Sequence, residues 1–157
     1  MPSPGPTASR PHVPGYGIPD DRRGILLWSH AVERLEAARE YWVTTADRDG
    51  RPHAVPVWGV WVEDVLLFGG GPTRWARNLS ANPEVVVHLE SGVDVVIVEG
   101  AVTRTKDGDP LSEAAQDAYE AKYRFRHPPP FWVLRPRAAF AWTEFPRDAT
   151  RWRFEGR

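Results

Sequence analysis

The chain of 157 residues contains no cysteine. This absence excludes disulfide bonds, a thiolate nucleophile, a CxxC redox pair, and zinc or iron–sulfur centres with cysteine ligands. An excess of charge is missing as well, because 20 basic side chains stand against 21 acidic ones. A net charge near zero gives no overall attraction to nucleic acid or to an anionic membrane. Any anion site must therefore be local, and any redox chemistry needs a bound cofactor.

Long hydrophobic runs are also missing. The longest, such as residues 95–98, are far shorter than the ~18 residues that cross a bilayer. The N-terminal segment has no apolar stretch of the kind found in signal peptides. We therefore expect a cytoplasmic protein without membrane or nucleic-acid partners, and the length suits one folded domain.

Proline is concentrated at the start of the chain, where the first 19 residues hold six of the 16 prolines. Such a composition buries little apolar surface and offsets little of its ordering entropy. We predict a flexible arm over residues 1–24, either disordered or draped over the protein, with disorder favoured. A lid over a partner subunit is the alternative. The folded domain is predicted over residues 25–157.

Hydrophobic periodicity predicts a mainly β protein with two or three short helices. Helices are expected at residues 30–40, where Ser29 is a candidate N-cap, and at 73–79 and 111–123. Strands are expected at residues 41–45, 53–62, 65–68, 84–90, 93–103, 131–135, 138–145 and 150–154. Most strands follow one another through short turns, which favours antiparallel pairing in a small barrel or a strongly curled sheet.

The glycine-rich segment 69–79 is a candidate anion site. It joins a strand to a helix whose N-cap is Thr73, so free backbone N–H groups and the positive end of the helix dipole meet there. Arg74 and Arg77 add two guanidinium groups that suit a phosphate or carboxylate. The segment matches neither the P-loop nor the GxGxxG pattern. The alternative is a plain connector with solvated arginines.

Residues 51–61 form a second candidate segment. Pro56 cannot donate a ladder hydrogen bond, so its strand has a gap, a bulge or an exposed edge. Backbone groups of Val55 and Val57 are then free to meet a ligand. The rings of Trp58 or Trp61 could lie against a planar ligand, or could fill a barrel or dimer core, which we favour for Trp61.

Other constellations carry little chemistry. No nucleophile–base pairing, HExxH motif or paired-carboxylate spacing is present, so no catalytic side chain and no metal site are predicted. His88 and Glu90 share one strand face, and we interpret them as a hydrogen-bonded structural pair. Lys122, Arg124 and Arg126 lie near a helix C-terminus, where cations interact favourably with the dipole.

Several motifs together resemble a known family. They are YWVTTADRDGRPHAVPVW at residues 41–58, TRWARNLSANP at 73–83, FWVLRP at 131–136 and TRWRF at 150–154. This pattern, over residues 30–154, resembles the pyridoxamine 5′-phosphate oxidase-like split β-barrel superfamily, and looks most similar to its branch that uses flavin or deazaflavin (F420) cofactors.

The resemblance implies a homodimer with the cofactor in a groove between two split β-barrels. It places the cofactor phosphate at residues 73–78 and the ring along the strand of residues 55–57. The cofactor-binding residues that we expect are His53, Val55, Pro56, Val57, Trp58, Thr73, Arg74, Trp75, Arg77 and Asn78.

Two departures from the family pattern bear on the cofactor. Trp75 stands where a phosphate-binding lysine is common, so it could stack on a ring or block the phosphate pocket. Val55 stands where the true pyridoxamine phosphate oxidases have an arginine, which favours F420 over FMN. The resemblance thus implies an oxidoreductase that transfers hydride from reduced F420 to an unsaturated small molecule. Its alternatives are an FMN flavoprotein, a non-catalytic carrier of flavin, deazaflavin or haem, and a cofactor-free structural dimer.

Overall fold

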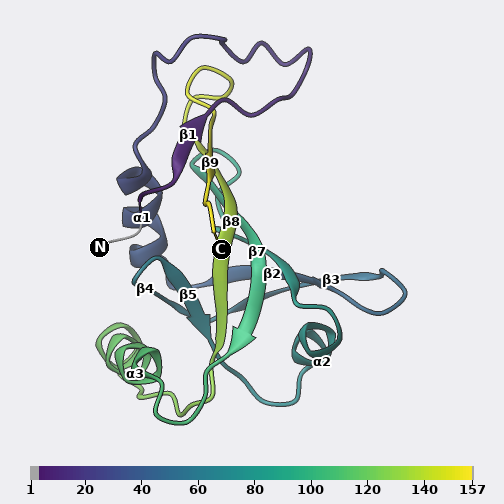
Figure 1. Ribbon diagram of the computed structural model, residues 1–157, viewed down its shortest axis with the longest axis vertical. Coiled ribbons are helices and arrows are strands. Elements are labelled where there is room, and N and C mark those ends of the chain that lie inside the picture. Colours follow the sequence, from purple (N-terminus) through teal and green to yellow (C-terminus); the bar gives the residue numbers. More distant parts are fainter. Residues whose placement is uncertain (1–3, 157) are drawn as a thin grey trace.

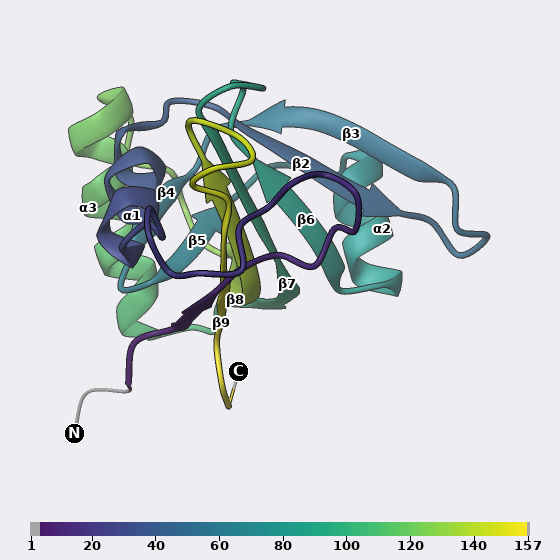
Figure 2. The same cartoon turned by 90° about the horizontal axis from the view of Figure 1, so that it is seen from above.

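The computed structural model describes residues 4–156, which form one curled antiparallel sheet and three helices (Figures 1 and 2). The strands are β1 Thr7–Ser9, β2 Tyr41–Ala46, β3 Pro52–Val57, β4 Val60–Val62, β5 Val65–Phe68, β6 Glu84–His88, β7 Val95–Arg104, β8 Trp132–Trp142 and β9 Thr150–Arg153. The helices are α1 Trp28–Ala37, α2 Arg74–Ala81 and α3 Pro110–Tyr123.

The sheet order is β1-β9-β8-β7-β6-β2-β3, and the β4–β5 hairpin joins through β5 to β8. Strand β8 changes partner along its length: residues 132–134 pair with β5, and residues 138–141 pair with β9. The sheet therefore splits along β8, and the mainly β, split-barrel class predicted from the sequence is confirmed. Figures 1 and 2 show α1 and α3 on one side of the molecule, and α2 with the projecting β2–β3 hairpin on the other.

Two predicted strands differ from those in the structure, and in both cases a glycine lies at the point of difference. The predicted strands 131–135 and 138–145 are one strand, β8, because its pairing with β7 shifts register between Glu99 and Gly100 and so accommodates Pro136. A Cβ at Gly100 would lie 2.2 Å from the carbonyl oxygen of Arg135, so only glycine permits this close approach. Conversely, the predicted strand 53–62 is divided into β3 and β4 at Gly59.

Helix α1 begins earlier than predicted, and Ser29 is not its N-cap. The cap position is Leu27, which supplies no side-chain hydrogen bond. The first helical residue is Trp28, whose ring packs edge-on against Trp152 and Phe154 with centroids 5.2 and 5.0 Å apart. Aromatic packing, rather than a polar cap, thus determines where this helix starts.

The N-terminal arm is ordered along the sheet in its described part, residues 4–24. Strand β1 pairs with β9, and the Arg10 guanidinium donates to the carbonyl oxygens of Asp21, Arg23, Arg147 and Ala149. These hydrogen bonds stabilise a segment that buries little apolar surface. Residues 4–24 therefore take the draped form of the predicted arm, not the disordered form that was favoured. Residues 1–3 of the predicted arm lie outside the described residues.

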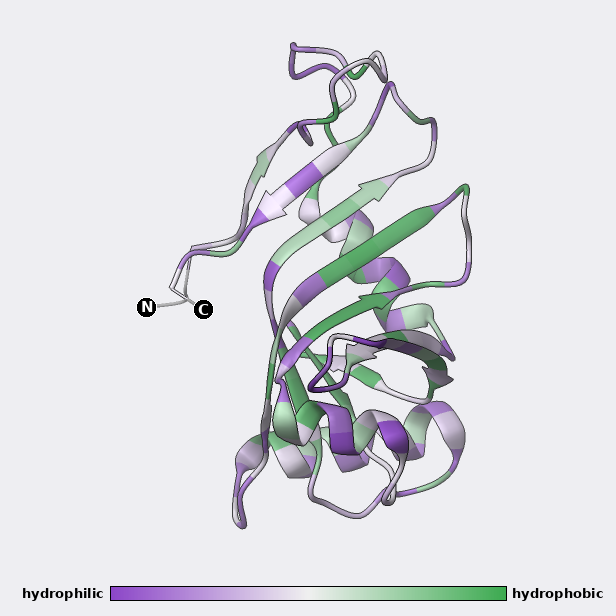
Figure 3. Ribbon diagram, turned by 90° about the vertical axis from the view of Figure 1, so that its right-hand side faces the viewer, coloured by the Kyte–Doolittle hydropathy of each residue, from purple (hydrophilic) through white to green (hydrophobic). Residues whose placement is uncertain are grey.

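The three helices pack against the inner side of the barrel. Helices α1 and α2 contribute Ala31, Leu35, Trp75 and Leu79 to the main hydrophobic core, and α3 covers a second core beside β4 and β5. In Figure 3, hydrophobic residues run along the central strands of the sheet. Within the described residues, no helix is long and apolar enough to span a membrane.

Candidate functional site

Helix α2 separates its charged side chains from its apolar ones. Thr73 is its N-cap, and the Thr73 Oγ1 accepts a hydrogen bond from the Ala76 N–H over 3.2 Å, as the sequence predicts. Arg74 and Arg77 are exposed, and neither forms an ion pair within residues 4–156. Arg77 Nη1 donates to the Pro72 carbonyl oxygen over 3.4 Å, and the other donors of the two guanidinium groups are suited to an anion.

Asn78 fixes α2 to the sheet. Its side chain is 6% exposed, and Nδ2 donates to Oγ1 of Thr45 in β2 over 3.0 Å. Thr45 lies directly opposite His53 of β3. The structure therefore brings the predicted residues Asn78 and His53 together through Thr45, and joins the helix to the edge strand.

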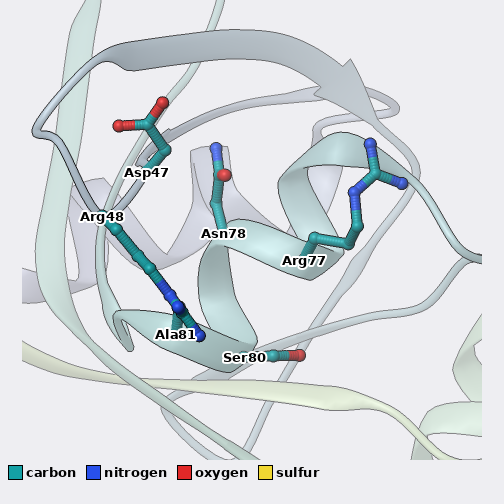
Figure 4. A pocket seen from close by; sticks show the side chains of 6 residues that line it. All are labelled: Asp47, Arg48, Arg77, Asn78, Ser80 and Ala81. Carbon is teal, nitrogen blue, oxygen red and sulfur yellow. The ribbon is translucent and has the colours of Figure 1, made fainter.

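A pocket of about 410 Å³ opens between α2 and the β2–β3 hairpin. Figure 4 shows its lining side chains, from α2 and from the segment that follows β2: Asp47, Arg48, Arg77, Asn78, Ser80 and Ala81. Sequence reasoning found Arg77 and Asn78 but missed Arg48, which lies between the predicted strands 41–45 and 53–62, outside both candidate segments. Two guanidinium groups and an amide thus meet at one open pocket.

The single carboxylate of this pocket is engaged in the hairpin turn. Asp47 Oδ1 accepts hydrogen bonds from the backbone N–H groups of Arg51 and Asp49, each over 2.9 Å. The bond from the Arg51 N–H has the largest effect in lowering the pKa of Asp47, and the bond from the Asp49 N–H adds to it. The positive charges of Arg51 and Arg74 lower this pKa further. Arg48 and Arg77 line the pocket and Arg74 acts electrostatically on Asp47, so arginine charge outweighs this one carboxylate.

Strand β3 forms an edge of the sheet, because within the described residues it pairs only with β2. His53, Val55 and Val57 are half-buried on the inner face, where both valines pack against the main core. Pro56 is exposed on the opposite face, opposite Trp42. An edge strand leaves alternate backbone N–H and C=O groups unpaired, so the predicted exposed edge at Pro56 is present.

Trp58 and Trp61 have different environments. The Trp61 ring is 6% exposed and lies within the main core, as favoured from the sequence. Trp58, just beyond the end of β3, is 49% exposed, and its ring stacks in parallel on Tyr123 of α3 with centroids 4.4 Å apart. Of the two rings, only Trp58 could meet a planar ligand.

The expectation that Trp75 faces the cofactor is corrected. Its ring is 6% exposed and packs in the core against Phe68, with centroids 5.5 Å apart. A Cβ at Gly70 would lie 2.8 Å from this ring, so the glycine run passes directly over the indole. Trp75 therefore neither stacks on a bound ring nor blocks the pocket; its helical position points inward, where an apolar side chain is stabilised by burial.

A half-buried cation close to the β3–β4 connection was also missed. The Lys122 Nζ donates to the carbonyl oxygens of Ala38 and Gly59 over 2.7 and 3.2 Å, and to the Tyr41 hydroxyl over 3.0 Å. Burial lowers the pKa of Lys122 to about 8. Lys122 thus holds the β3–β4 connection in place, and its position near a helix C-terminus gave no sign of this role.

His88 is a structural residue. The His88 Nδ1 lies 2.7 Å from the Leu89 carbonyl oxygen, and the ring stacks on Trp42. It is hydrogen-bonded as expected, but to a backbone oxygen rather than to Glu90. No cluster of three metal-ligating side chains occurs in the part of the chain that the structure describes.

Comparison with known proteins adds a family and a fold. The sequence model of the family described as pyridoxamine 5′-phosphate oxidase matches residues 27–157. No protein with a curated description matches the chain.

Solved structures of similar fold include proteins with three different cofactors in their names. An F420 reductase is 24% identical, with a TM-score of 0.53 over 67% of this chain and 91% of its own. A FAD-binding protein from Mesorhizobium loti is 20% identical, with a TM-score of 0.60 over 82% and 96%. The heme storage protein HutZ from Vibrio cholerae is 17% identical, with a TM-score of 0.56 over 70% of this chain and 91% of its own. At these identities the likeness concerns the fold.

Proposed function

The chain belongs to the pyridoxamine 5′-phosphate oxidase family, and we propose that it is an oxidoreductase that binds the deazaflavin F420 and transfers hydride to an unsaturated small molecule. The observation that carries this proposal is the arrangement of an anion pocket and an exposed aromatic ring at the two ends of one edge strand. The pocket lies where Asn78 meets Thr45, opposite His53, and Trp58 follows five residues later. At ~3.3 Å per residue, the two ends are ~16 Å apart, which suits an elongated cofactor with a phosphate at one end and a ring at the other.

Two parts of the chain would bind the two ends of such a cofactor. Arg77, Asn78 and Arg48 would hold the phosphate, with Arg74 adding charge at the helix N-terminus. The free edge of β3 would place hydrogen-bonding groups beside the ring, along Val55, Pro56 and Val57. When bound, the deazaflavin supplies the hydride, so the protein contributes orientation and exclusion of water rather than an acid or base.

F420 is preferred to FMN and to haem on the character of these residues. Val55 is apolar where the true pyridoxamine phosphate oxidases have an arginine, so one phosphate contact of the FMN enzymes is missing. Trp75 replaces a phosphate-binding lysine, and the loss of this cation favours a non-catalytic carrier; against it, the exposed Arg74 and Arg77 supply two other cations on the same helix. An FMN flavoprotein and a carrier of flavin or haem remain the alternatives, and both are tested by the experiments below.

Alanine at Arg77 is expected to weaken F420 binding by ~1–3 kcal/mol, because a charge-assisted hydrogen bond to phosphate is lost. Arg74→Ala is expected to have a smaller effect in the same direction. Arg153→Ala is the matched control. Arg153 is an exposed arginine on β9, which lies at the other end of the sheet from β2 and β3, the strands beside α2. Calorimetric titration of each variant with F420, FMN and haem measures the affinities, and equal affinities for all variants would refute the phosphate assignment.

Catalysis is tested separately from binding. We expect reduced F420 to be oxidised when an enone or a quinone is added to the protein, as followed by absorbance. Tight binding of a cofactor without turnover would favour the carrier, and FMN-dependent turnover would favour the flavoprotein. A cytoplasmic location is part of the same proposal.

A homodimer is also part of the proposal, and one row of side chains on the outer face of the sheet supports it. Cross-strand register aligns this row through seven residues: Pro56, Trp42, His88, Ile97, Phe140, Arg151 and Ser9. The helices pack on the other side, so no helix within residues 4–156 covers the apolar members of this row. A second copy packed on this face would also approach the free edge of β3.

Phe140→Arg is expected to convert the dimer to a monomer, because it places a charge in the middle of the proposed apolar interface. Val93→Arg serves as control, since Val93 is 74% exposed in the β6–β7 turn, outside the row. Analytical ultracentrifugation gives the mass of each variant. If Phe140→Arg keeps the mass and the F420 affinity of the unmodified protein, this face is not the interface.

A further inference from the structure

The pocket between α2 and the β2–β3 hairpin contains one carboxylate, that of Asp47, beside the guanidinium groups of Arg48 and Arg77 (Figure 4). Its other lining residues carry no charge. A negative charge in the wall of a phosphate pocket repels the phosphate and weakens its binding. The presence of Asp47 is therefore not explained by phosphate binding alone.

The β2–β3 turn explains one oxygen of Asp47 but not its charge. Oδ1 accepts hydrogen bonds from the backbone N–H groups of Asp49 and Arg51. Asparagine offers the same oxygen and is favoured in such turns for the same reason. Oδ2 lies 3.7 Å from Nη1 of Arg51, too far for a hydrogen bond, and exposed ion pairs of this kind contribute little stability. The turn thus requires an acceptor at position 47 and no carboxylate.

The negative charge of Asp47 persists beside the pocket. The backbone hydrogen bond from Arg51 has the largest effect in lowering its pKa, so the carboxylate is ionised at neutral pH. The Arg51 guanidinium lies closer to Asp49, with an ion pair of 2.9 Å, than to Asp47. Arg51 therefore compensates Asp49 more than Asp47, and the charge of Asp47 acts on whatever anion the pocket holds.

The effect of this charge depends on the class of phosphate. A phosphomonoester carries about two negative charges at pH 7, because its second pKa is ~6, whereas a phosphodiester carries one. Repulsion by a fixed carboxylate is proportional to the charge of the ligand, and is about twice as strong for the monoester. The arginines attract the monoester more strongly than the diester, and the carboxylate offsets part of that advantage. A repulsive group of this kind provides selectivity rather than affinity.

From this arrangement we propose that Asp47 is a specificity-determining residue of the pocket, which favours a phosphodiester over a phosphomonoester. The inference rests on the proposed function and deepens it, because the phosphate of F420 is a diester and that of FMN is a monoester. The choice between the two cofactors is then made at Asp47, beside the phosphate, as well as at Val55.

Two small phosphates test the pocket without a cofactor. Phenyl phosphate is a monoester and methyl phenyl phosphate is its diester, so the two share a ring and differ in charge. NMR titration, followed at the amides of the lining residues Asn78 and Ser80, gives both affinities for the cofactor-free protein. In Asp47→Asn, which keeps the acceptor of the turn, we expect the affinity for phenyl phosphate to rise about fivefold and that for methyl phenyl phosphate about twofold.

Asp107→Asn is the matched control. Asp107 is an exposed aspartate in another turn, between β7 and α3, and it does not line the pocket. Its ratio of the two affinities should equal that of the unmodified protein. An equal change of both affinities in Asp47→Asn, or no change in either, would overturn the inference. So would the absence of shifts at Asn78 and Ser80 with both phosphates, because the pocket would then hold no phosphate.

Calorimetric titration with F420 separates the failure of the two proposals. If F420 does not bind while the two small phosphates show the expected difference, the proposed function fails and the selection by Asp47 stands. If F420 binds and Asp47→Asn changes both small-phosphate affinities equally, the selection fails and the proposed function stands.

Discussion

Trp75→Ala is expected to lower the free energy of unfolding by ~3–5 kcal/mol, the cost of truncating a buried tryptophan in a packed core. The ring is 6% exposed and contacts both Phe68 and the backbone of the glycine run. The surrounding backbone is fixed by the strand on one side and the helix on the other, so the cavity cannot collapse fully. Urea denaturation followed by circular dichroism measures the change.

Trp58→Ala is the matched control for this prediction, because Trp58 is a tryptophan that is half-exposed rather than buried. Its expected loss of stability is ~1 kcal/mol, since water already covers much of the ring. Equal losses for the two variants would show that Trp75 is not a core residue.

Trp75→Lys provides a sharper comparison between the two interpretations of this position. If Trp75 faced the phosphate, a lysine would strengthen F420 binding, as expected from the family pattern. In the structure, the lysine would place an ammonium group among apolar side chains and destabilise the protein further than alanine does. A stable Trp75→Lys protein with improved cofactor affinity would contradict the structure at this position.

The contrast between Thr73 and Trp75 shows what the sequence can predict about this site. The Thr73 cap, the exposed arginines and the strand-to-helix connection follow from local rules, because N-cap chemistry and charge are properties of a few neighbouring residues. The direction of the Trp75 side chain depends on which face of the short helix α2 is turned toward the core, and that is set by contacts with the sheet. A family pattern with a lysine at this position gave the wrong side for the tryptophan.

Long-range contacts explain the other differences. Pro136 suggested two strands, and only the register shift opposite Gly100 shows how one strand passes through it. Tyr123, the last residue of a helix more than 60 residues away in sequence, stacks on Trp58 and donates a hydrogen bond to the Gly59 carbonyl oxygen. No periodicity or spacing in the sequence indicates such a meeting, so this contact could not be predicted.

Lys122→Met is expected to change how stability depends on pH. Burial lowers the pKa of Lys122 to about 8 in the folded protein, against 10.5 for the free side chain. Between these two values the unfolded chain binds more protons than the folded one, so the free energy of unfolding rises with pH. The full effect of such a difference is ~3 kcal/mol, and solvent screening of a half-exposed ammonium reduces it to ~1–2 kcal/mol.

The methionine variant has no titrating group at this position, so the stability difference between the unmodified protein and Lys122→Met should grow from pH 8 to 10.5. Burial raises the pKa values of Tyr41 and Tyr119, which lower the stability of both proteins above pH 10. The difference is therefore compared below pH 10, because Tyr41 accepts a hydrogen bond from Lys122 Nζ and does not titrate independently of it. Lys106→Met controls for loss of an exposed lysine and should show a constant difference. Urea titrations at several pH values give both curves. If the Lys122→Met difference is flat, the ammonium is solvated, and the β3–β4 connection that orients Trp58 is held by Tyr123 and Tyr119 alone.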